Sequence, residues 1–361
     1  MTVGVVNVAA MTTKQPEFTL NRPGALIAAL PAILGFVPEK SLILVSVDGG
    51  ELGAVLRVDL CDELADTVGH LADVAAAAAP AAAIAVIVDA AGARCPVCND
   101  QHRRLVDALS LELSRNDIAL LSAHVVDRVA RGGRWRCVDG CGAGGPVEDP
   151  AASPLAAAAV LEGRRLYPRR ADLQAVIAPD TACLAAVAAV IDDQAADRAA
   201  AVAADGQGRA RRDVEAMLQA VAALAAGREP TEVELARLGC SLTDVLVRDT
   251  LCALAIGEHA SDAEMLWSIL ARALPGPWRA DALVLLAFSA YARGDGPLAG
   301  VSLEAALRCV PDHRMAGLLD TALQSGLRPD RIRGLADTGF RLAAQLGVRL
   351  PQRQGLGRRA G

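Results

Sequence analysis

The sequence has 361 residues, of which 53% are hydrophobic and 22% are charged, and its formal net charge is −6. A chain of this length usually folds as two domains, and its acidic balance argues against nucleic-acid binding by the protein as a whole. No uninterrupted apolar run reaches the length of about 18 residues that marks a transmembrane helix, so the sequence predicts no membrane span.

The cysteine count indicates a reducing compartment. Nine cysteines, an odd number, are spread along a chain whose first residues do not read as an export signal. This usage is typical of free thiols in the cytoplasm rather than of a disulfide framework. Five of the cysteines have apolar neighbours in sequence and are expected to be small core residues: Cys61, Cys183, Cys240, Cys252 and Cys309.

An apolar helix followed directly by a strand opens the ordered part of the chain. Leu26, Leu30 and Ile33 recur at spacings of three and four, which predicts one apolar helical stripe that stops at Gly35. The run Leu42 to Val47 then predicts a strand. After a turn around Gly49, Ala54 to Leu60 predicts a second strand, and the two strands together predict a hairpin.

The next segments keep alternating between helix and strand. Helices are predicted over residues 63–79 and 101–114, and strands over 83–88, 120–126 and 135–138. This order predicts an α/β sandwich with a mixed sheet over residues 19–150, preceded by a flexible tail over residues 1–18. The Gly- and Pro-rich stretch Gly140 to Pro150 is expected to be a surface loop or a domain boundary.

Everything after Ser153 has a helical pattern. The sequence predicts an all-helical domain over residues 151–337 and a basic, partly disordered tail over 338–361. Small and large residues between Ala280 and Pro311 fall close to the positions of a tetratricopeptide repeat, with Gly294-Asp295-Gly296 at the turn between its two helices. One repeat is weak evidence for an array, and an ordinary helical hairpin is the alternative.

Several of these segments together resemble a known family. They are Pro31-x-x-Leu34-Gly35-Phe36-x-Pro38-x-x-Ser41-Leu42, Arg57 and Asp59, Trp135-Arg136-Cys137 with Cys141, and Gly294-Asp295-Gly296 with the residues that follow. In these features the chain resembles an actinobacterial family known only as a domain of unknown function, over about Thr19 to Pro329. The resemblance implies an α/β part followed by a helical part and brings no activity, substrate or catalytic residue.

Two short-spaced cysteine pairs form the most specific chemical motif. Cys95-x-x-Cys98 and Cys137-x-x-x-Cys141 would supply four thiolates for a tetrahedral zinc ion if the strands ending near Asp89 and Val138 are neighbours. Two unrelated pairs of loop thiols are the alternative. A thioredoxin-like redox role for the first pair requires a helix that begins at Cys95, and the sequence predicts a helix start only near Gln101.

Three aspartates each follow a predicted strand. Asp59, Asp89 and Asp127 would lie at the carboxyl edge of a parallel sheet, where ligands usually bind, so together with Arg57 they are candidate ligand-binding residues for Mg²⁺ or a sugar hydroxyl. Aspartates at strand ends also commonly serve as turn residues or helix caps. The five histidines are scattered without a close pair, and each is expected to be a satisfied or exposed side chain.

Three functions remain open on the sequence. No GxGxxG, GxxxxGK[ST] or G-x-S-x-G motif occurs and no catalytic residue is predicted, which favours a non-enzymatic interaction or scaffold protein that binds a protein partner through its helical domain. The alternatives are a small-ligand binder or enzyme that uses the strand-end carboxylates, and a zinc-stabilised nucleic-acid-associated factor. A membrane association is not expected.

Overall fold

The computed structural model describes residues 22–353, apart from residues 50, 62–63, 78, 94, 162–163 and 326. The predicted tail over residues 1–18 therefore lies outside the described residues. The chain forms two compact units, one made of residues up to Leu173 with two short later segments, 295–300 and 321–328, and the other made of the remaining residues. The first is an α/β unit and the second is helical, which confirms the predicted fold class.

The α/β unit is built on a six-stranded mixed sheet with the order β2-β1-β3-β4-β5-β6. Only β3 and β4 run parallel, and every other neighbouring pair is antiparallel. The strands are β1 (Ser41–Asp48), β2 (Glu51–Asp59), β3 (Ala82–Val88), β4 (Ala119–Val126), β5 (Arg134–Cys137) and β6 (Gly144–Pro146). The predicted β1–β2 hairpin is confirmed.

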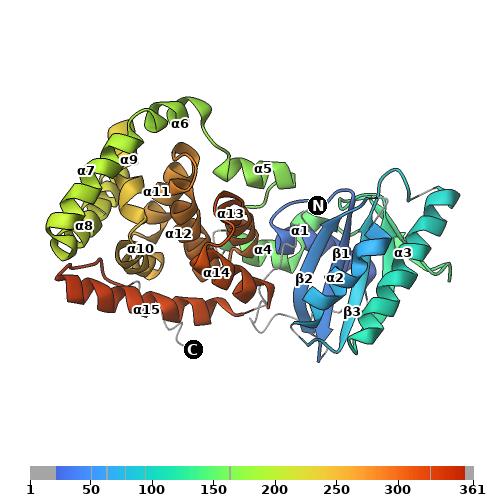
Figure 1. The fold of residues 1–361 in the computed structure, drawn as a ribbon. Helices are drawn as coiled ribbons and strands as arrows, with labels where there is room; N and C mark the ends of the chain where they lie inside the picture. The colour runs from blue at the N-terminus through green and yellow to red at the C-terminus, as the bar shows by residue number, and fades with distance from the viewer. Residues whose placement is uncertain are drawn as a thin grey trace. The chain divides into compact units, whose positions relative to one another are not determined.

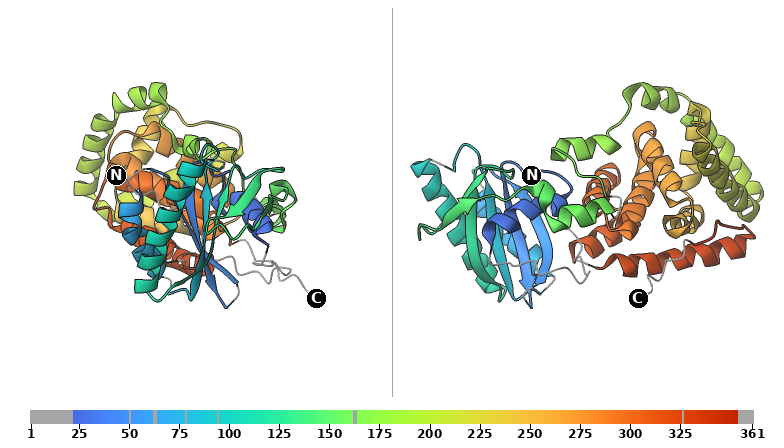
Figure 2. Two further views of the ribbon diagram at one scale, coloured as in Figure 1. Left: turned by 90° about the vertical axis from the view of Figure 1, so that its right-hand side faces the viewer. Right: turned by 180° about the vertical axis from the view of Figure 1, so that it is seen from behind.

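Helices cover both faces of this sheet. Views from the front and from behind show α2 (Leu64–Ala76) and α3 (Pro96–Arg115) on one face and α1 (Pro23–Leu34) on the other (Figures 1 and 2). Nearly every residue of α1 is buried, as expected for a helix that is apolar all round. The fourth helix of this unit, α4 (Pro154–Leu161), packs against α1.

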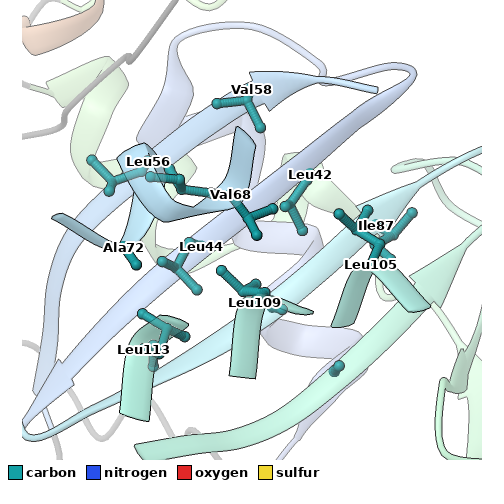
Figure 3. Packing of buried hydrophobic residues seen from close by; sticks show 14 of the residues in the cluster. Leu42, Leu44, Leu56, Val58, Val68, Ala72, Ile87, Leu105, Leu109 and Leu113 are labelled. Carbon is teal, nitrogen blue, oxygen red and sulfur yellow. The ribbon is translucent and has the colours of Figure 1, made fainter. Parts of the chain in front are cut away.

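The core between the sheet and helices α2 and α3 follows the two periodicities of the sequence. Alternate residues of β1 and β2, such as Leu44 and Leu56, point from the sheet to one side, because side chains of a strand alternate between its faces (Figure 3). Leu105, Leu109 and Leu113 meet them from α3 at the spacing of one helical turn. These apolar contacts fix the position of α3 on the sheet.

Two local predictions were wrong. Helix α3 begins at Pro96 rather than near Gln101, because proline suits the first helical position and the Cys95 sulfur caps the helix by accepting a hydrogen bond from the Cys98 N–H at 3.5 Å. Part of the Gly-rich stretch predicted as a loop or boundary forms β6, which pairs with β5. Short strands rich in glycine carry no apolar alternation, so no strand pattern could be recognised there.

The α/β unit also continues beyond residue 150, where the sequence analysis ended it. Residues near Tyr167 run beside those near Gly35, since the Tyr167 N–H donates to the Gly35 carbonyl at 2.7 Å and the Val37 N–H donates to the Tyr167 carbonyl at 3.2 Å. The buried Arg164 donates to the carbonyl of Ala32 at 3.2 Å. Helical composition identifies α4 as a helix but does not indicate which unit it joins.

The helical unit is organised around α12 (Trp278–Arg293), which is buried along most of its length. It packs against α9, α11 and α15. The helices after α4 are α5 (Arg170–Gln174), α6 (Thr181–Ala188), α7 (Ile191–Ala204), α8 (Gly206–Ala225), α9 (Glu232–Leu242), α10 (Val245–Leu251), α11 (Ala260–Ala273), α12, α13 (Gly296–Cys309), α14 (Arg314–Gln324) and α15 (Pro329–Leu346). Short 3₁₀ turns lie just before α4, at Pro150–Ala152, and later at Ala175–Ile177 and Cys252–Ile256.

The turn of the predicted repeat is found where expected, since α12 ends at Gly294 with φ of 90° and α13 begins at Gly296. The tetratricopeptide-like character of this hairpin stays a prediction. Helix α15 extends to Leu346, past the predicted end of the helical domain at residue 337. Its buried residues Ile332, Ala336, Gly339, Ala343 and Leu346 continue the helical spacing through a segment whose arginines suggested a tail.

One stretch of the described residues, Arg170–Ala188, is long and apolar enough by length and composition to cross a membrane. It is not one continuous helix, because residues 178–180 separate the 3₁₀ turn at Ala175–Ile177 from α6. A spanning segment must satisfy all of its backbone hydrogen bonds within itself, so this interrupted stretch is weak evidence for a span.

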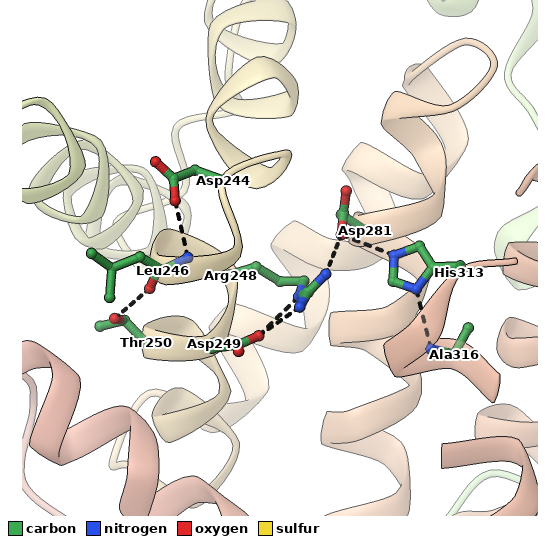
Figure 4. A network of polar contacts seen from close by, with 8 residues as sticks. All are labelled: Asp244, Leu246, Arg248, Asp249, Thr250, Asp281, His313 and Ala316. Carbon is green, nitrogen blue, oxygen red and sulfur yellow. Dashed lines mark hydrogen bonds and ion pairs between the residues drawn. The ribbon is translucent and has the colours of Figure 1, made fainter. Parts of the chain in front are cut away.

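A buried charge network joins three helices of the helical unit (Figure 4). Arg248 on α10 donates to Asp281 on α12 at 3.0 Å and to its neighbour Asp249 at 2.8 Å. His313, just before α14, contacts Asp281 at 3.1 Å through Nε2, while its Nδ1 accepts the Ala316 N–H at 3.1 Å. Because Nδ1 is an acceptor, the ring proton lies on Nε2 and is donated to Asp281.

The packing of the core between the sheet and α3 predicts how much stability is lost when a buried side chain is shortened. Replacing the fully buried Leu44 by alanine is expected to lower the free energy of unfolding by about 2–5 kcal/mol, the range found for buried Leu→Ala changes. Leu111→Ala is the matched control, because Leu111 on α3 is 54% exposed and its loss should change stability by no more than about 0.5 kcal/mol. Equal losses in urea unfolding of the two variants would contradict the packing described.

The charge network makes a second prediction. Asp281→Ala leaves Arg248 and His313 buried without their shared acceptor, so the free energy of unfolding should fall by about 3–5 kcal/mol. Asp330→Ala removes the partner of Arg333 in a pair whose carboxylate is 78% exposed, and it should cost no more than about 1 kcal/mol. Denaturant unfolding that ranks the two variants in the opposite order would refute a structural role for this network.

Candidate functional site

A cleft of about 410 Å³ opens beside strand β5 in the α/β unit. Its lining combines charged side chains, one aromatic ring, one thiol and several glycines: Ala93, Val125, Asp127, Arg134, Trp135, Arg136, Cys137, Gly140, Gly142, Ala143, Gly144 and Gly145. All of these residues come from β4, from the β5–β6 hairpin and from the loop that precedes α3. The cleft is therefore formed within one unit of the chain.

Strand register explains why two arginines share this cleft. Val125 of β4 belongs to the core beneath α3, and Arg136 of β5 lies directly opposite Val125. Opposed residues of an antiparallel pair point to the same face, and so do residues two positions apart. Arg134 and Arg136 are thus on the α3 side of the sheet, at the carboxyl end of β4, which is where open α/β sheets usually bind ligands.

Hydrogen bonds fix Arg136 against the start of α3. Its Nε donates to the carbonyl of Ala93 at 2.9 Å, and its Nη1 donates to the side-chain oxygen of Asn99 at 2.5 Å. Asn99 lies in the first turn of α3, whose backbone N–H groups carry partial positive charge. The guanidinium group of Arg136, which lines the cleft, is therefore held beside the start of α3.

Asp127 lines the cleft but its carboxylate is engaged in the β4–β5 turn. One oxygen accepts the backbone N–H groups of Arg128 and Arg134 at 2.7 and 2.8 Å, and the other lies 3.5 Å from the Arg128 guanidinium. These bonds compensate its negative charge locally. The Asp127 carboxylate stabilises the turn, and Arg134 and Arg136 make the electrostatic potential of the cleft positive.

The other predicted ligand-binding residues lie at the same edge of the sheet with partners of their own. Asp59 pairs with the buried Arg57 at 2.5 Å, and burial lowers the pKa of Arg57. Asp89 accepts the Gly92 N–H at 2.9 Å and contacts His102 of α3 at 3.1 Å. Among the described residues, no cluster of three metal-ligating groups contains Asp59, Asp89 or Asp127.

The structure gathers one of the two cysteine pairs into a compact cluster. The ligand atoms of Cys137, Asp139 and Cys141 all lie within 4.8 Å of one another, and within the described part of the chain neither Cys95 nor Cys98 belongs to this group. The predicted adjacency fails because β4 separates β3 from β5. In addition, β5 runs antiparallel to β4, so Cys137 pairs with His124, two residues before Val126, the last residue of β4. Cys137 therefore does not lie at the carboxyl end of β4.

The three groups of this cluster affect one another's protonation. The neighbouring Cys137 thiol, the Cys141 N–H, which donates to the carboxylate at 2.9 Å, and the Cys141 thiol lower the pKa of Asp139 to about 2. Burial, followed by the hydrogen bond to Asp139, raises the pKa of the Cys137 thiol to about 11. The cluster therefore combines an ionised carboxylate with a thiol that resists ionisation.

Sequence reasoning missed two residues here. Asp139 stands between the two cysteines, so the pattern Cys-x-Asp-x-Cys was a signal that could have been noticed. His124 carries no signal in the sequence, and only the β4–β5 register reveals that it lies across from Cys137. Its ring packs edge-on against Trp135 with centroids 5.1 Å apart, and burial lowers its pKa.

The remaining cysteines correct two expectations. Cys95 is the N-cap of α3, so the helix that a thioredoxin-like pair requires is present, and the prediction that no helix begins at Cys95 was wrong. A hydrogen bond to Cys95 is the main reason that the pKa of Cys98 is raised. Of the five cysteines expected in the core, Cys240 and Cys252 are buried, Cys183 and Cys309 are partly buried, and Cys61 is exposed directly after β2.

Comparison with known proteins gives one finding. No curated protein and no solved structure matches the chain. One family, described as "Domain of unknown function (DUF4192)", matches residues 23–330, which include the sheet, the cleft, the cysteine–aspartate cluster and most of the helices. The chain therefore belongs to this family of unknown function, as the sequence resemblance predicted.

Proposed function

We propose that the protein binds a small anionic ligand in the β5 cleft. The observation that carries this proposal is the pair Arg134 and Arg136 in a cleft of about 410 Å³ at the carboxyl end of β4. Sites for metabolites and cofactors commonly have volumes of about 300–1,000 Å³. The proposal develops the small-ligand alternative drawn from the sequence, with arginines in place of the predicted carboxylates as the recognition groups.

The charge of the cleft favours an anion over a cation. Arg134 and Arg136 contribute two positive charges, and the one carboxylate among the lining residues, Asp127, is compensated by two backbone N–H groups and Arg128. In a cleft with low-dielectric walls, these charges reinforce one another.

The rigidity of Arg136 supports specific binding. Ala93 and Asn99 already hold its guanidinium, so a ligand would not have to order this side chain. Reducing the conformational entropy lost on association strengthens binding without any additional contact. Binding rather than catalysis is proposed, because the recognition groups are two arginines.

The other functional predictions remain predictions. A protein partner on the helical unit is consistent with exposed apolar side chains there, such as Val233, Val245 and Met265, while the described cavity between α8 and α9 measures only about 50 Å³. The nine free thiols support the cytoplasm as the compartment in which we propose that the protein acts.

Thermal unfolding in the presence of anions tests the proposal. Pyrophosphate, citrate and AMP are added separately to the full chain, each against sodium chloride of equal ionic strength. At least one anion should raise the unfolding midpoint, because a ligand at 100 times its Kd stabilises the folded state by about 2.7 kcal/mol. Absence of a shift with all three anions counts against the proposal.

A pair of arginine variants locates the binding. Arg134→Gln should weaken the affinity for the stabilising anion by about 10–100-fold, the equivalent of one lost charged hydrogen bond of about 1.5–3 kcal/mol. Arg131→Gln is the matched control, because Arg131 is exposed on the same turn and does not line the cleft. Titration calorimetry that finds equal affinities for the two variants would place the anion elsewhere.

A further inference from the structure

The hairpin that forms one wall of the cleft brings three metal-ligating groups together. Cys137 ends β5, and Asp139 and Cys141 lie in the turn that leads to β6. Their ligand atoms lie within 4.8 Å of one another. Zinc bonds of about 2.0–2.3 Å require ligand atoms less than about 4.6 Å apart, so small side-chain rotations are sufficient to enclose an ion.

The backbone of this turn holds the three groups in place. The Cys137 N–H donates to the carbonyl of Ala143 at 2.8 Å, which closes the turn, and the Cys141 N–H donates to the Asp139 carboxylate at 2.9 Å. Gly140 and Gly142 have φ of 78° and 81°, a region that disfavours other residues. The turn is therefore folded so that its ligand atoms meet.

A buried histidine next to the cluster has a ring nitrogen without a partner. His124 is 5% exposed and lies opposite Cys137 in the strand register, so both side chains are on the same face of the sheet. Its Nε2 contacts the Ser122 hydroxyl at 3.1 Å, whereas no described residue forms a hydrogen bond with Nδ1. A buried polar nitrogen without a partner is costly, and a metal ion would satisfy it.

We propose that Cys137, Asp139 and Cys141 bind a zinc ion, and that His124, whose ring nitrogens lie outside the group of ligand atoms within 4.8 Å, turns toward the ion as the fourth protein ligand. Two thiolates, one carboxylate and one imidazole form a ligand set that zinc accepts in tetrahedral geometry. Zinc binds thiolates, so the two thiols lose their protons to water when the ion binds. The contact of Ser122 with Nε2 orients the imidazole, as outer partners of zinc-bound histidines commonly do.

This site differs from the one that the sequence suggested, because it does not use Cys95 or Cys98. It is also independent of anion binding, although Cys137, Gly140 and Gly142 belong to the cleft wall as well. A bound ion would hold the turn and β5 in one arrangement. Metal binding is measured without any anion, so failure of one proposal is distinguishable from failure of the other.

Titration of the reduced, metal-free full chain with Co²⁺ and then Zn²⁺ tests the site. About one equivalent of Co²⁺ should produce a thiolate-to-cobalt charge-transfer band and the intense visible bands of a tetrahedral ion, and Zn²⁺ should remove them. Failure to bind either ion would overturn the proposal, as would a Cys137–Cys141 disulfide that persists in thiol reductant by mass spectrometry.

Variants identify the ligands. Cys141 is exposed, so Cys141→Ser should leave the fold intact, which circular dichroism checks. Its zinc affinity should fall by more than the roughly 10–100-fold seen when a residue that only hydrogen-bonds to a metal ligand is lost. Asp139→Ala should also weaken it, whereas Cys61→Ser, another exposed thiol of the same unit, should leave it unchanged. Unchanged affinity in Cys141→Ser would overturn the proposal.

Two further variants decide between alternative ligand sets. The double variant Cys95→Ser, Cys98→Ser should keep the cobalt spectrum and zinc affinity of the wild type, and loss of metal binding in it would favour the four-cysteine site instead. His124→Gln should lower the zinc affinity and change the visible cobalt bands. An unaltered spectrum in His124→Gln would overturn the assignment of His124 as the fourth ligand.

Discussion

The pairing of β4 with β5 is the constraint on which the candidate sites depend. Its register sets Arg136 opposite Val125 on the α3 face and Cys137 opposite His124 on the other face. A shift by one residue would exchange the two faces, because strand side chains alternate. The same few backbone hydrogen bonds between β4 and β5 therefore determine which side chains line the cleft and which surround the cysteine–aspartate cluster. The Asp127 carboxylate stabilises the turn between the two strands.

Much of the fold was predictable because its core follows simple periodicities. The leucines of β1 and α3 recur at spacings of two and of three to four, and these patterns identified the main strands and helices of the α/β unit. Elements held by backbone pairing or capping were missed instead. Strand β6 consists of Gly144, Gly145 and Pro146, and the start of α3 depends on Cys95 as a cap, so neither has an apolar pattern.

The candidate site was predictable only in part, since it depends on the order of strands in space. Sequence spacing identified Cys137 and Cys141 as a pair, and the structure brings them together. The predicted four-cysteine site with Cys95 and Cys98 assumed that β3 and β5 are neighbouring strands, whereas β4 lies between them. His124 is separated from Cys137 in sequence and joins it only through the antiparallel register. The strand-end aspartates were predicted to bind a ligand or to serve as turn residues, and the hydrogen bonds that the structure shows for them stabilise turns and pairs.

Hydrogen–deuterium exchange of the full chain tests most directly whether the β5–β6 hairpin is a binding element. Exchange is measured by mass spectrometry for the metal-free protein, with Zn²⁺, and with pyrophosphate. Zn²⁺ should slow exchange in peptides covering residues 134–146, and pyrophosphate should slow it there and at the start of α3, while exchange in the helical unit stays unchanged. Unchanged exchange in residues 134–146 with both additives, or protection confined to the helical unit, would contradict this role of the hairpin.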